Sequence, residues 1–267
     1  MNITVNERPS SVAAGTTLRS IHQAHRPDAD IVILNGGVMA DDCMLKDGDA
    51  VVLIRRGAQP SRNEFEALLA ARHTPGVHQR LKQACIGIAG LGGLGSMSAI
   101  ALARTGVGRL ILVDFDVVEP SNLNRQQYFT DQIGMGKAEA LCATLMRINP
   151  FVACQPVCVK LEPGNIADVF KDADVLIEAF DRPDMKAMLA ASYKNAYPDR
   201  PIVMASGVAG CGPENSIRVH EPGTGLFVVG DLETAAQPGT GLMAPRVGIA
   251  AHMQANLAVR LILEKYT

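Results

Sequence analysis

The stretch Cys85–Arg125, which reads CIGIAGLGGLGSMSAIALARTGVGRLILVDFDVVEPSNLNR, decides the fold of this chain. Its pattern is a β-branched strand, a glycine turn, an Ala-rich helix, a second strand and an acidic residue. These segments are Cys85–Ala89, the motif Gly90-x-Gly92-x-x-Gly95, Gly93–Thr105, Arg109–Val113 and Asp114. The order predicts a βαβ unit whose glycine turn lies at the carboxyl end of the first strand.

Composition narrows the class of protein. The 267 residues are 48% apolar and 4% aromatic, with no Trp, so the core must be aliphatic, as in α/β proteins with buried parallel strands. Lys and Arg total 25 against 27 Asp and Glu, a balance that does not favour nucleic-acid binding. No apolar run is long enough to span a membrane, and MNITVNERPS lacks a signal pattern. Six scattered Cys predict reduced thiols and a cytoplasmic location.

Residues Met1–Arg56 are predicted to form a small domain of their own. The pattern is strand, turn, helix, hairpin, turn and strand, which is the order of a β-grasp fold. The expected helix and later strands are Leu18–His25, Ile31–Leu34, Val38–Ala40 and Ala50–Ile54. Residues 57–83 then form a linker with two helical segments, Asn63–Ala71 and Pro75–Gln83.

Residues 84–267 are predicted to form a Rossmann-like, doubly wound α/β domain with a mostly parallel sheet. The elements expected after the βαβ unit are a helix over Gly136–Ile148, strands over Ala153–Lys160 and Val175–Glu178, a helix over Pro183–Ala196, strands over Pro201–Ala205 and Asn215–His220, and a helix over Arg246–Leu263. The strand Asn215–His220 need not be parallel. Glu221–Pro245 shows no periodicity and predicts a long loop that is functional or mobile.

The glycine motif predicts a nucleotide site. Gly90 permits the tight turn, Gly92 lets the backbone approach a phosphate, and Gly95 lets the helix pack on the strand. Asp114 follows at the spacing expected for an acid that binds a ribose. The direct interpretation is NAD, and the alternative is a tight structural turn that holds no ligand.

Residues beyond Asp114 favour ATP over NAD. Asn122, Arg125 and Lys137 follow in the next loop and helix. Cleavage of an α–β phosphate bond needs such charge stabilisation, together with a divalent metal held by a carboxylate. Asp181, which follows a strand end, is a candidate for that ligand. Taken alone, Arg125 and Lys137 would more commonly be exposed surface charges, and it is their placement beside the nucleotide turn that favours a role there.

Several ordered motifs carry a family resemblance. The segments GLGGLGS, LVDFDVVEPSNLNRQ, GKAEA, INP and AFDRPD, which span about Arg62–Leu263, resemble the ThiF/MoeB/HesA adenylyltransferases, relatives of the ubiquitin-activating enzymes. Met1–Arg56 is similar to the sulfur carrier ThiS in MNITVN, AAGTTL, ILNGGVM and DGDAVVLI. The whole chain therefore resembles a second family of ThiF-type ThiS adenylyltransferases, in which a ThiS-like domain precedes the ThiF-like domain.

The resemblance implies roles for individual residues. The implied nucleotide-contacting residues are Gly90, Gly92, Gly93, Gly95, Asp114, Asp116, Asn122 and Gln126. Arg125 and Lys137 would contact phosphates, and Asp181 would serve Mg²⁺ and the adenylation step. The family also takes an Arg from a partner subunit, for which Arg72 is the first candidate and Arg62 the second; each could instead be a plain surface Arg.

The implied reaction is attack of a carrier's C-terminal carboxylate on the α-phosphate of ATP, which yields an acyl-adenylate and pyrophosphate. The implied partners are a separate ThiS-type sulfur carrier of thiamine (thiazole) biosynthesis and a second copy in a homodimer. A MoaD-type carrier, a small molecule or a tRNA carboxylate is an alternative acceptor. A nucleotide-holding scaffold without turnover and an NAD-dependent oxidoreductase remain alternatives from other classes.

Three departures from the family pattern shape the prediction. The chain has no CxxC pair, so we expect no zinc site. Glu221–Pro245 contains no Cys, and Cys211 is expected to be a small buried thiol, so the enzyme would stop at adenylation. The ThiS-like domain continues into Gly57-Ala58-Gln59 and lacks a free Gly-Gly tail. We therefore interpret it as a pseudo-carrier that docks a partner or shapes the enzyme; the alternative is an appendage that stabilises the fold.

Overall fold

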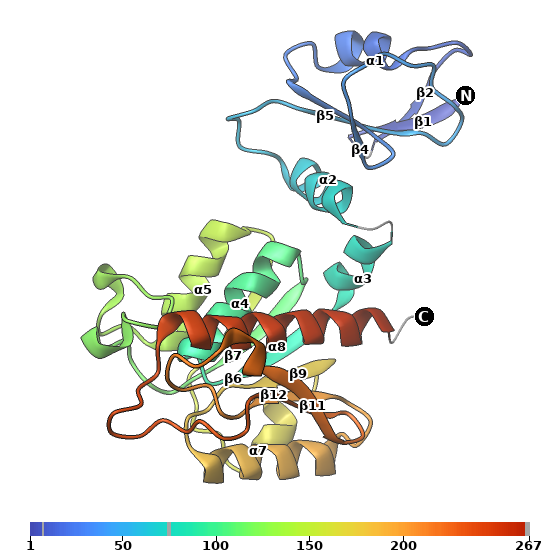
Figure 1. Ribbon diagram of the computed structural model, residues 1–267. Helices are drawn as coiled ribbons and strands as arrows, with labels where there is room; N and C mark the ends of the chain where they lie inside the picture. Colours follow the sequence, from blue (N-terminus) through green and yellow to red (C-terminus); the bar gives the residue numbers. More distant parts are fainter. Residues whose placement is uncertain (7, 74–75, 265–267) are drawn as a thin grey trace. The chain divides into compact units, whose positions relative to one another are not determined.

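The computed structural model describes residues 1–6, 8–73 and 76–264. The chain divides into two compact units, Met1–Gln79 and Arg80–Thr267, and each is described by itself (Figure 1). Helix α3 (Val77–Gln83) spans the boundary between them. Its predicted start at Pro75 lies outside the described residues. Within the described ranges, no helix is both long enough and apolar enough to cross a bilayer.

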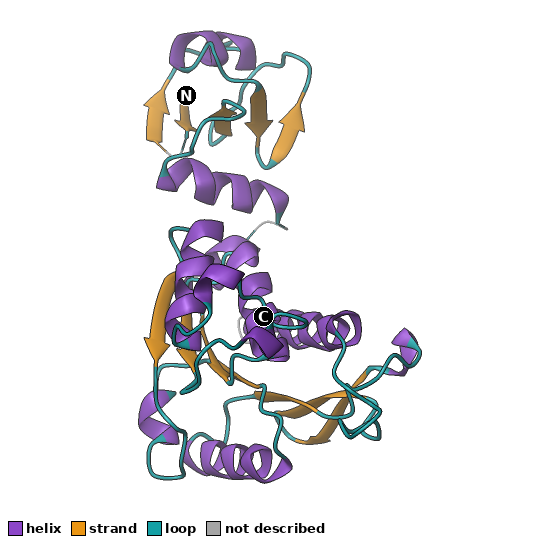
Figure 2. Ribbon diagram, turned by 90° about the vertical axis from the view of Figure 1, so that its left-hand side faces the viewer, coloured by secondary structure: helices purple, strands orange, loops and turns teal. Residues whose placement is uncertain are grey.

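The N-terminal unit is a five-stranded sheet with a helix on each face (Figure 2). Its elements are β1 (Asn2–Val5), β2 (Arg8–Ser11), α1 (Leu18–His25), β3 (Ile31–Leu34), β4 (Gly37–Met39), β5 (Ala50–Ile54) and α2 (Arg62–Arg72). The strand order is β2-β1-β5-β3-β4, with β1 and β5 parallel, as in a β-grasp. Helix α1 begins at Thr17, whose side chain accepts a hydrogen bond from the Ser20 amide. The strand β2 was not predicted from the sequence.

Helix α2 packs on the sheet face opposite α1. Val51 and Leu53 belong to the core beneath α1, so alternation along β5 directs Ile54 to the opposite face. Ile54 and Ile33 are nevertheless buried, and α2 lies against β5 on that side (Figure 1). Ser61 and Glu64 form a capping box that fixes where α2 begins.

The C-terminal unit is a seven-stranded sheet in the order β11-β12-β10-β9-β6-β7-β8. All neighbouring strands are parallel except β11 and β12. Its elements are β6 (Cys85–Ala89), α4 (Gly93–Thr105), β7 (Arg109–Val113), α5 (Lys137–Ile148), β8 (Ala153–Val157), α6 (Ile166–Val169), β9 (Val175–Glu178), α7 (Pro183–Ala196), β10 (Ile202–Ala205), β11 (Arg218–Gly223), β12 (Leu226–Gly230) and α8 (Ala244–Glu264). Helices α4, α5 and α8 pack together on one face, and α7 covers the other (Figure 1). The predicted doubly wound, mostly parallel architecture is confirmed.

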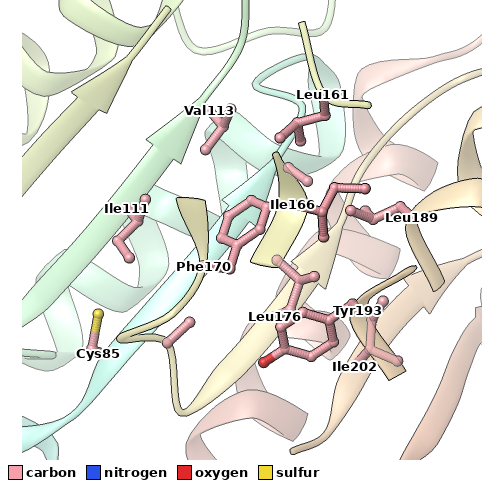
Figure 3. Packing of buried hydrophobic residues seen from close by; sticks show 12 residues of the cluster. Cys85, Ile111, Val113, Leu161, Ile166, Phe170, Leu176, Leu189, Tyr193 and Ile202 are labelled. Atoms are coloured by element: carbon pink, nitrogen blue, oxygen red, sulfur yellow. The ribbon is translucent and has the colours of Figure 1, made fainter. Parts of the chain in front are cut away.

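The core beneath α6 and α7 is organised around two aromatic rings (Figure 3). Phe170 and Tyr193 are fully buried and meet edge to face, with ring centroids 6.5 Å apart. Phe170 also presses on β6, because a Cβ added at Gly87 would lie 2.6 Å from Phe170 Cδ1. The glycine in the middle of β6 is therefore a packing requirement, and it seats the strand that carries the glycine turn.

The prediction of a long structureless loop over Glu221–Pro245 is wrong. Leu226–Gly230 forms β12, which pairs in parallel with β10, and β11 reaches Gly223. The predicted strand Asn215–His220 begins only at Arg218, after a 3₁₀ turn over Glu214–Ser216. LFVVG is a short apolar run between glycines, and buried strands of this length show no alternation.

Candidate functional site at the carboxyl edge of the sheet

The glycine turn between β6 and α4 is tightly packed at two of its positions and open at a third. Gly90 has a φ of +89°, and a Cβ on it would lie 2.9 Å from the Ala179 carbonyl oxygen. A Cβ on Gly95 would lie 1.9 Å from the Gly90 oxygen. A Cβ on Gly92 would meet only Gln126 Nε2, at 3.8 Å. Gly92 is therefore the position at which another group can approach the backbone, beside the free N–H groups that begin α4.

Asp114 leaves the end of β7 and braces the turn. Its Oδ2 accepts a hydrogen bond from the Leu91 amide at 2.7 Å, and its Oδ1 accepts one from the Asp116 amide at 2.9 Å. Burial raises the pKa of Asp114, and these two hydrogen bonds oppose that rise. The Asp114 carboxylate thus lies beside the glycine turn, where the sequence predicts that it binds a ribose.

The loop that follows β7 folds back over the start of α4. Tyr128 is buried, and its hydroxyl donates to the Leu91 carbonyl at 2.8 Å. The Gln127 amide donates to Ser96 Oγ at 3.1 Å. These contacts hold residues 121–128 against the glycine turn. Neither Tyr128 nor Ser96 was singled out from the sequence, and an aromatic after an NLNRQ segment gives no distinct signal by itself.

Three predicted site residues lie in this loop. Asn122 is buried, its Oδ1 accepts the Glu119 amide at 3.1 Å, and its carbonyl accepts the Gln126 amide at 2.9 Å. Arg125 lies over the turn, because a Cβ on Gly93 would be 3.6 Å from Arg125 Cγ. Its Nη1 donates to the Ser121 carbonyl and to Asn124 Oδ1. The structure therefore brings Asn122, Arg125 and Gln126 to the glycine turn.

Gln126 carries an unsatisfied polar atom. The residue is 7% exposed, and its Oε1 is buried without a hydrogen-bond partner in the described part of the chain. A buried acceptor without a partner costs free energy, on the order of 1–3 kcal/mol. The end of Gln126 that lies nearest Gly92 is Nε2, at 3.8 Å from the position of a Cβ there, so the side chain offers a donor to a group that binds at the turn, which fits a nucleotide phosphate.

Lys137 opens α5 and is held by a carboxylate. Its Nζ donates to Asp116 Oδ2 at 3.0 Å, and its amide donates to the Asp116 carbonyl at 2.9 Å. The Lys137 side chain is 8% exposed, whereas that of Asp116 is 52% exposed. An ammonium has three donors, so Nζ keeps donors for a phosphate while Asp116 holds it in place.

Asp181 lies in the turn that follows β9. It is exposed, and Arg182 beside it forms an ion pair with Asp184 rather than with Asp181. The turn touches the nucleotide motif, because the Ala179 amide donates to the Ala89 carbonyl at 2.8 Å. Within the described ranges no three His, Cys, Asp or Glu side chains gather into a metal site. A lone carboxylate suits Mg²⁺, which usually takes one or two carboxylates together with substrate phosphates.

Sequence reasoning missed the buried charges behind Asp181. Glu178 is fully buried at the end of β9, and Lys186 Nζ donates to both of its oxygens, at 2.9 and 3.0 Å. Burial raises the pKa of Glu178, and Lys186 opposes that rise. An acid at the end of a strand and a Lys in the following helix are common in sequences, so only the structure shows that they meet.

A second cluster of charge lies at the start of α8. Arg246 is 4% exposed, and its Nη2 donates to Asp231 Oδ2 at 2.6 Å. Its Nη1 donates to the carbonyls of Gly212 and Pro213. These residues line a cavity of about 490 Å³ that Cys211 also borders. Cys211 is exposed, so the prediction of a buried thiol is wrong; the surrounding glycines supply no side chains to cover it.

The two candidate arginines for a partner's site lie in α2 of the N-terminal unit. Arg62 Nε donates to Glu66 Oε1 at 3.1 Å within the helix. The side chain of Arg72 lies outside the described part of the structure. Their role therefore stays a prediction.

Comparison with known proteins now gives the family. The ThiF family model matches residues 66–267, and a ThiS-like ubiquitin model matches residues 1–57. The chain belongs to the ThiF family. This ThiF-family chain is 30% identical to the molybdopterin-synthase adenylyltransferase of Escherichia coli over 190 residues, which cover 69% of this chain and 75% of that protein. It is 30% identical to the adenylyltransferase and sulfurtransferase UBA4 of Kluyveromyces lactis over 220 residues, which cover 80% of this chain.

The ThiF-family chain spans about half the length of the UBA4 relatives it matches, 47% for the Kluyveromyces lactis protein. Among solved structures it resembles the E. coli tRNA N6-threonylcarbamoyladenosine dehydratase TcdA in complex with ATP. The TM-score is 0.70 at 25% identity, and the match covers 78% of this chain and 98% of TcdA. A TcdA complex with AMP gives the same score. The predicted family and its N-terminal ThiS-like domain are confirmed.

Proposed function

We propose that this protein is an ATP-dependent adenylyltransferase that activates the C-terminal carboxylate of a ubiquitin-like sulfur carrier. One observation carries the proposal: Arg125 and Gln126 converge on the glycine turn, beside Gly93 and Gly92. A turn that only held a dinucleotide would not need a cation across the start of α4. Charge at this position suits a reaction in which negative charge builds up on phosphate oxygens.

In the proposed reaction the carrier's carboxylate attacks the α-phosphorus of ATP, and the bond to the β-phosphate breaks to release pyrophosphate. The carboxylate is already deprotonated, so the protein need not remove a proton. Asp114 binds the ribose, and Asn122, Arg125 and Lys137 donate to phosphate oxygens. Asp181 holds Mg²⁺, which would neutralise charge on the phosphates. The remaining contribution is to position the two reactants.

The N-terminal unit supports a carrier as the acceptor and ThiS as its type. It matches a ThiS-like ubiquitin model, and this match supports our proposal that the carrier belongs to thiamine biosynthesis. Relatives named for molybdopterin synthase, UBA4 and a tRNA dehydratase support a MoaD-type carrier or another carboxylate as the second candidate. We propose that the enzyme is a cytoplasmic homodimer and that Arg72 or Arg62 of one copy reaches the site of the other.

The N-terminal unit itself is proposed to be a pseudo-carrier. Strand β5 ends at Ile54, and the chain enters α2 at Arg62 without a free end. The acceptor carboxylate therefore comes from a separate protein. Deletion of residues 1–56 should leave pyrophosphate exchange chemically possible while altering carrier affinity or assembly; unchanged kinetics and oligomeric state would reject the pseudo-carrier role.

The deciding experiment is carrier-dependent exchange of labelled pyrophosphate into ATP, run in parallel with a ThiS-type and a MoaD-type carrier. Exchange with one carrier identifies the acceptor, and Asp181→Ala should abolish it. Asp184→Ala is the matched control, because Asp184 lies three residues from Asp181, pairs with Arg182, and its loss should leave exchange intact. Tight NAD binding without ATP binding in calorimetry would overturn the proposal in favour of an oxidoreductase.

A further inference from the structure

Glu178 is a buried carboxylate whose hydrogen bonds converge from three directions. Lys186 Nζ on α7 donates to both oxygens. The Phe180 amide donates to Oε1 at 2.6 Å, and the Ala205 amide at the end of β10 lies 3.5 Å from Oε2. The Glu178 carbonyl accepts from Gln254 Nε2 on α8 at 3.0 Å. This one residue therefore ties together the elements that meet at the carboxyl edge of the sheet.

The turn that leaves Glu178 is pinned from both sides. On one side its Phe180 amide is held by the Glu178 carboxylate. On the other, the Ala179 carbonyl lies so close to Gly90 that a Cβ there would be 2.9 Å away. Asp181 is the next residue along, and within the described ranges its carboxylate accepts no hydrogen bond. Its position is therefore set by the turn and not by contacts of its own.

Stability alone does not explain a charged pair at this place. Taking a carboxylate and an ammonium out of water costs free energy that their attraction does not reliably offset, and apolar residues of similar volume often stabilise a protein as well. An apolar residue at position 178 could not accept the Phe180 amide, however. The ion pair opposes the rise that burial causes in the pKa of Glu178 and orients its carboxylate, so that the short hydrogen bond to the turn is retained.

We propose that Glu178 and Lys186 are positioning residues that hold the Ala179–Asp181 turn, and with it the Asp181 carboxylate, against the glycine turn. The proposal deepens the adenylyltransferase function and rests on it for the role of Asp181. Neither residue is proposed to touch the substrate. Glu178 acts through the Phe180 amide, and Lys186 acts through Glu178.

Two kinds of measurement test the pair. The first is hydrogen exchange of the Phe180 and Asp181 amides in the protein without metal or nucleotide. Glu178→Leu and Lys186→Met should both speed exchange at these amides by at least about tenfold, because the carboxylate no longer holds the turn. Lys186→Arg should restore slow exchange, because it keeps a cation that can donate to both oxygens.

The second measurement is pyrophosphate exchange with saturating ATP. A misplaced Asp181 should lower kcat about 10- to 100-fold and raise the Mg²⁺ concentration that gives half-maximal rate. The affinity for ATP without metal should stay within about twofold, because Asp114 and the glycine turn are untouched.

The matched control is Asp174→Asn, at the opposite end of the same strand. Asp174 Oδ2 accepts the Cys85 amide at 2.9 Å, so its loss also removes a carboxylate that braces β9. It should lower the melting temperature without changing kcat or the exchange of Phe180 and Asp181. Equal loss of kcat in the Asp174 and Glu178 variants, or unchanged amide exchange in Glu178→Leu and Lys186→Met, would overturn the positioning role. A wild-type protein that exchanges no pyrophosphate would instead reject the adenylyltransferase, while amide exchange would still test the pair.

Discussion

Glu64 of the N-terminal unit and Gln126 of the C-terminal unit differ in how fully their side-chain oxygens are hydrogen-bonded. In the N-terminal unit Glu64 accepts from Arg26, from Asn6 and from the Ser61 amide, so its contacts are complete within the unit. In the C-terminal unit Gln126 Oε1 is buried and unpartnered within the described ranges, and Gly92 leaves the backbone open beside it. The surroundings of Glu64 are therefore closed, whereas the glycine turn beside Gln126 is open to a ligand.

Substitutions in the glycine turn test most directly whether the space beside Gly92 binds a phosphate, and they have the largest expected effects. Gly95→Ala should destabilise the protein by several kcal/mol and abolish ATP binding, because its Cβ would lie 1.9 Å from the Gly90 oxygen. Gly92→Ala should keep its melting temperature but weaken ATP binding at least about tenfold, because its Cβ has room in the protein alone but would occupy the approach of a phosphate. Thermal unfolding and calorimetry with ATP measure both. Normal ATP affinity in Gly92→Ala would show that the turn is not the phosphate site.

A substitution at Glu64 tests the contribution of its ion pair with Arg26 to the stability of the N-terminal unit. Glu64→Gln should lower the stability of the N-terminal unit by about 1–3 kcal/mol, because it removes the charge that faces Arg26 across the unit. Denaturant unfolding followed by hydrogen exchange of β5 measures the loss. Arg55→Met is the control: its pair with Asp28 is exposed, at 59% and 52%, and should contribute well below 1 kcal/mol. Equal effects of the two substitutions would mean that the ion pair between Glu64 and Arg26 does not hold α2 against the sheet.

The C-terminal unit contains an ion pair between Asp231 and Arg246. This pair predicts that the stability of the unit depends on pH. Partial burial acts to raise the pKa of Asp231, but hydrogen bonds from Thr234 and Glu233 and the charge of Arg246 outweigh it and lower the pKa to about 2. The unfolded value is near 4, so the pair stabilises the fold above about pH 4 and this contribution is lost as the pH falls towards 2.

Asp231→Asn should therefore cost about 1–2 kcal/mol at pH 7, and its difference from the wild type should shrink between pH 4 and pH 2. Urea unfolding at a series of pH values measures this. A difference that stayed constant down to pH 2 would mean that Asp231 is not held ionised by Arg246 and its hydrogen bonds.

The smallest expected effect concerns the thiols. Cys211 is exposed, whereas burial raises the pKa of Cys85 to about 11. Iodoacetamide at pH 8 should therefore alkylate Cys211 in the folded protein and leave Cys85 unmodified, because the thiolate is the reactive form. Mass spectrometry of the peptides distinguishes the two sites. Modification of Cys85 at the same rate would show that the core of the C-terminal unit opens readily.

Local signals in the sequence were sufficient for the elements that form the nucleotide turn. The strand Cys85–Ala89, the helix Gly93–Thr105 and the strand Arg109–Val113 were predicted with the observed bounds, because glycine spacing and β-branched runs act over a few residues. The strand β12 was missed because its pairing with β10 is long-range and its five residues show no alternation. Glu178 and Lys186 were missed for a related reason, since an ion pair is a property of two positions brought together by the fold.

Helix α2 has a consequence for any route by which the N-terminal unit could act as a carrier. Cleavage of the chain after Gly57 would create a free C-terminal carboxylate three residues after β5 ends at Ile54. Adenylation needs such a carboxylate. The same cut would separate the sheet from the helix that covers the face bearing Ile33 and Ile54. Burial of two such side chains contributes on the order of several kcal/mol. Proteolytic release of a substrate from this domain would therefore undermine the domain that is released.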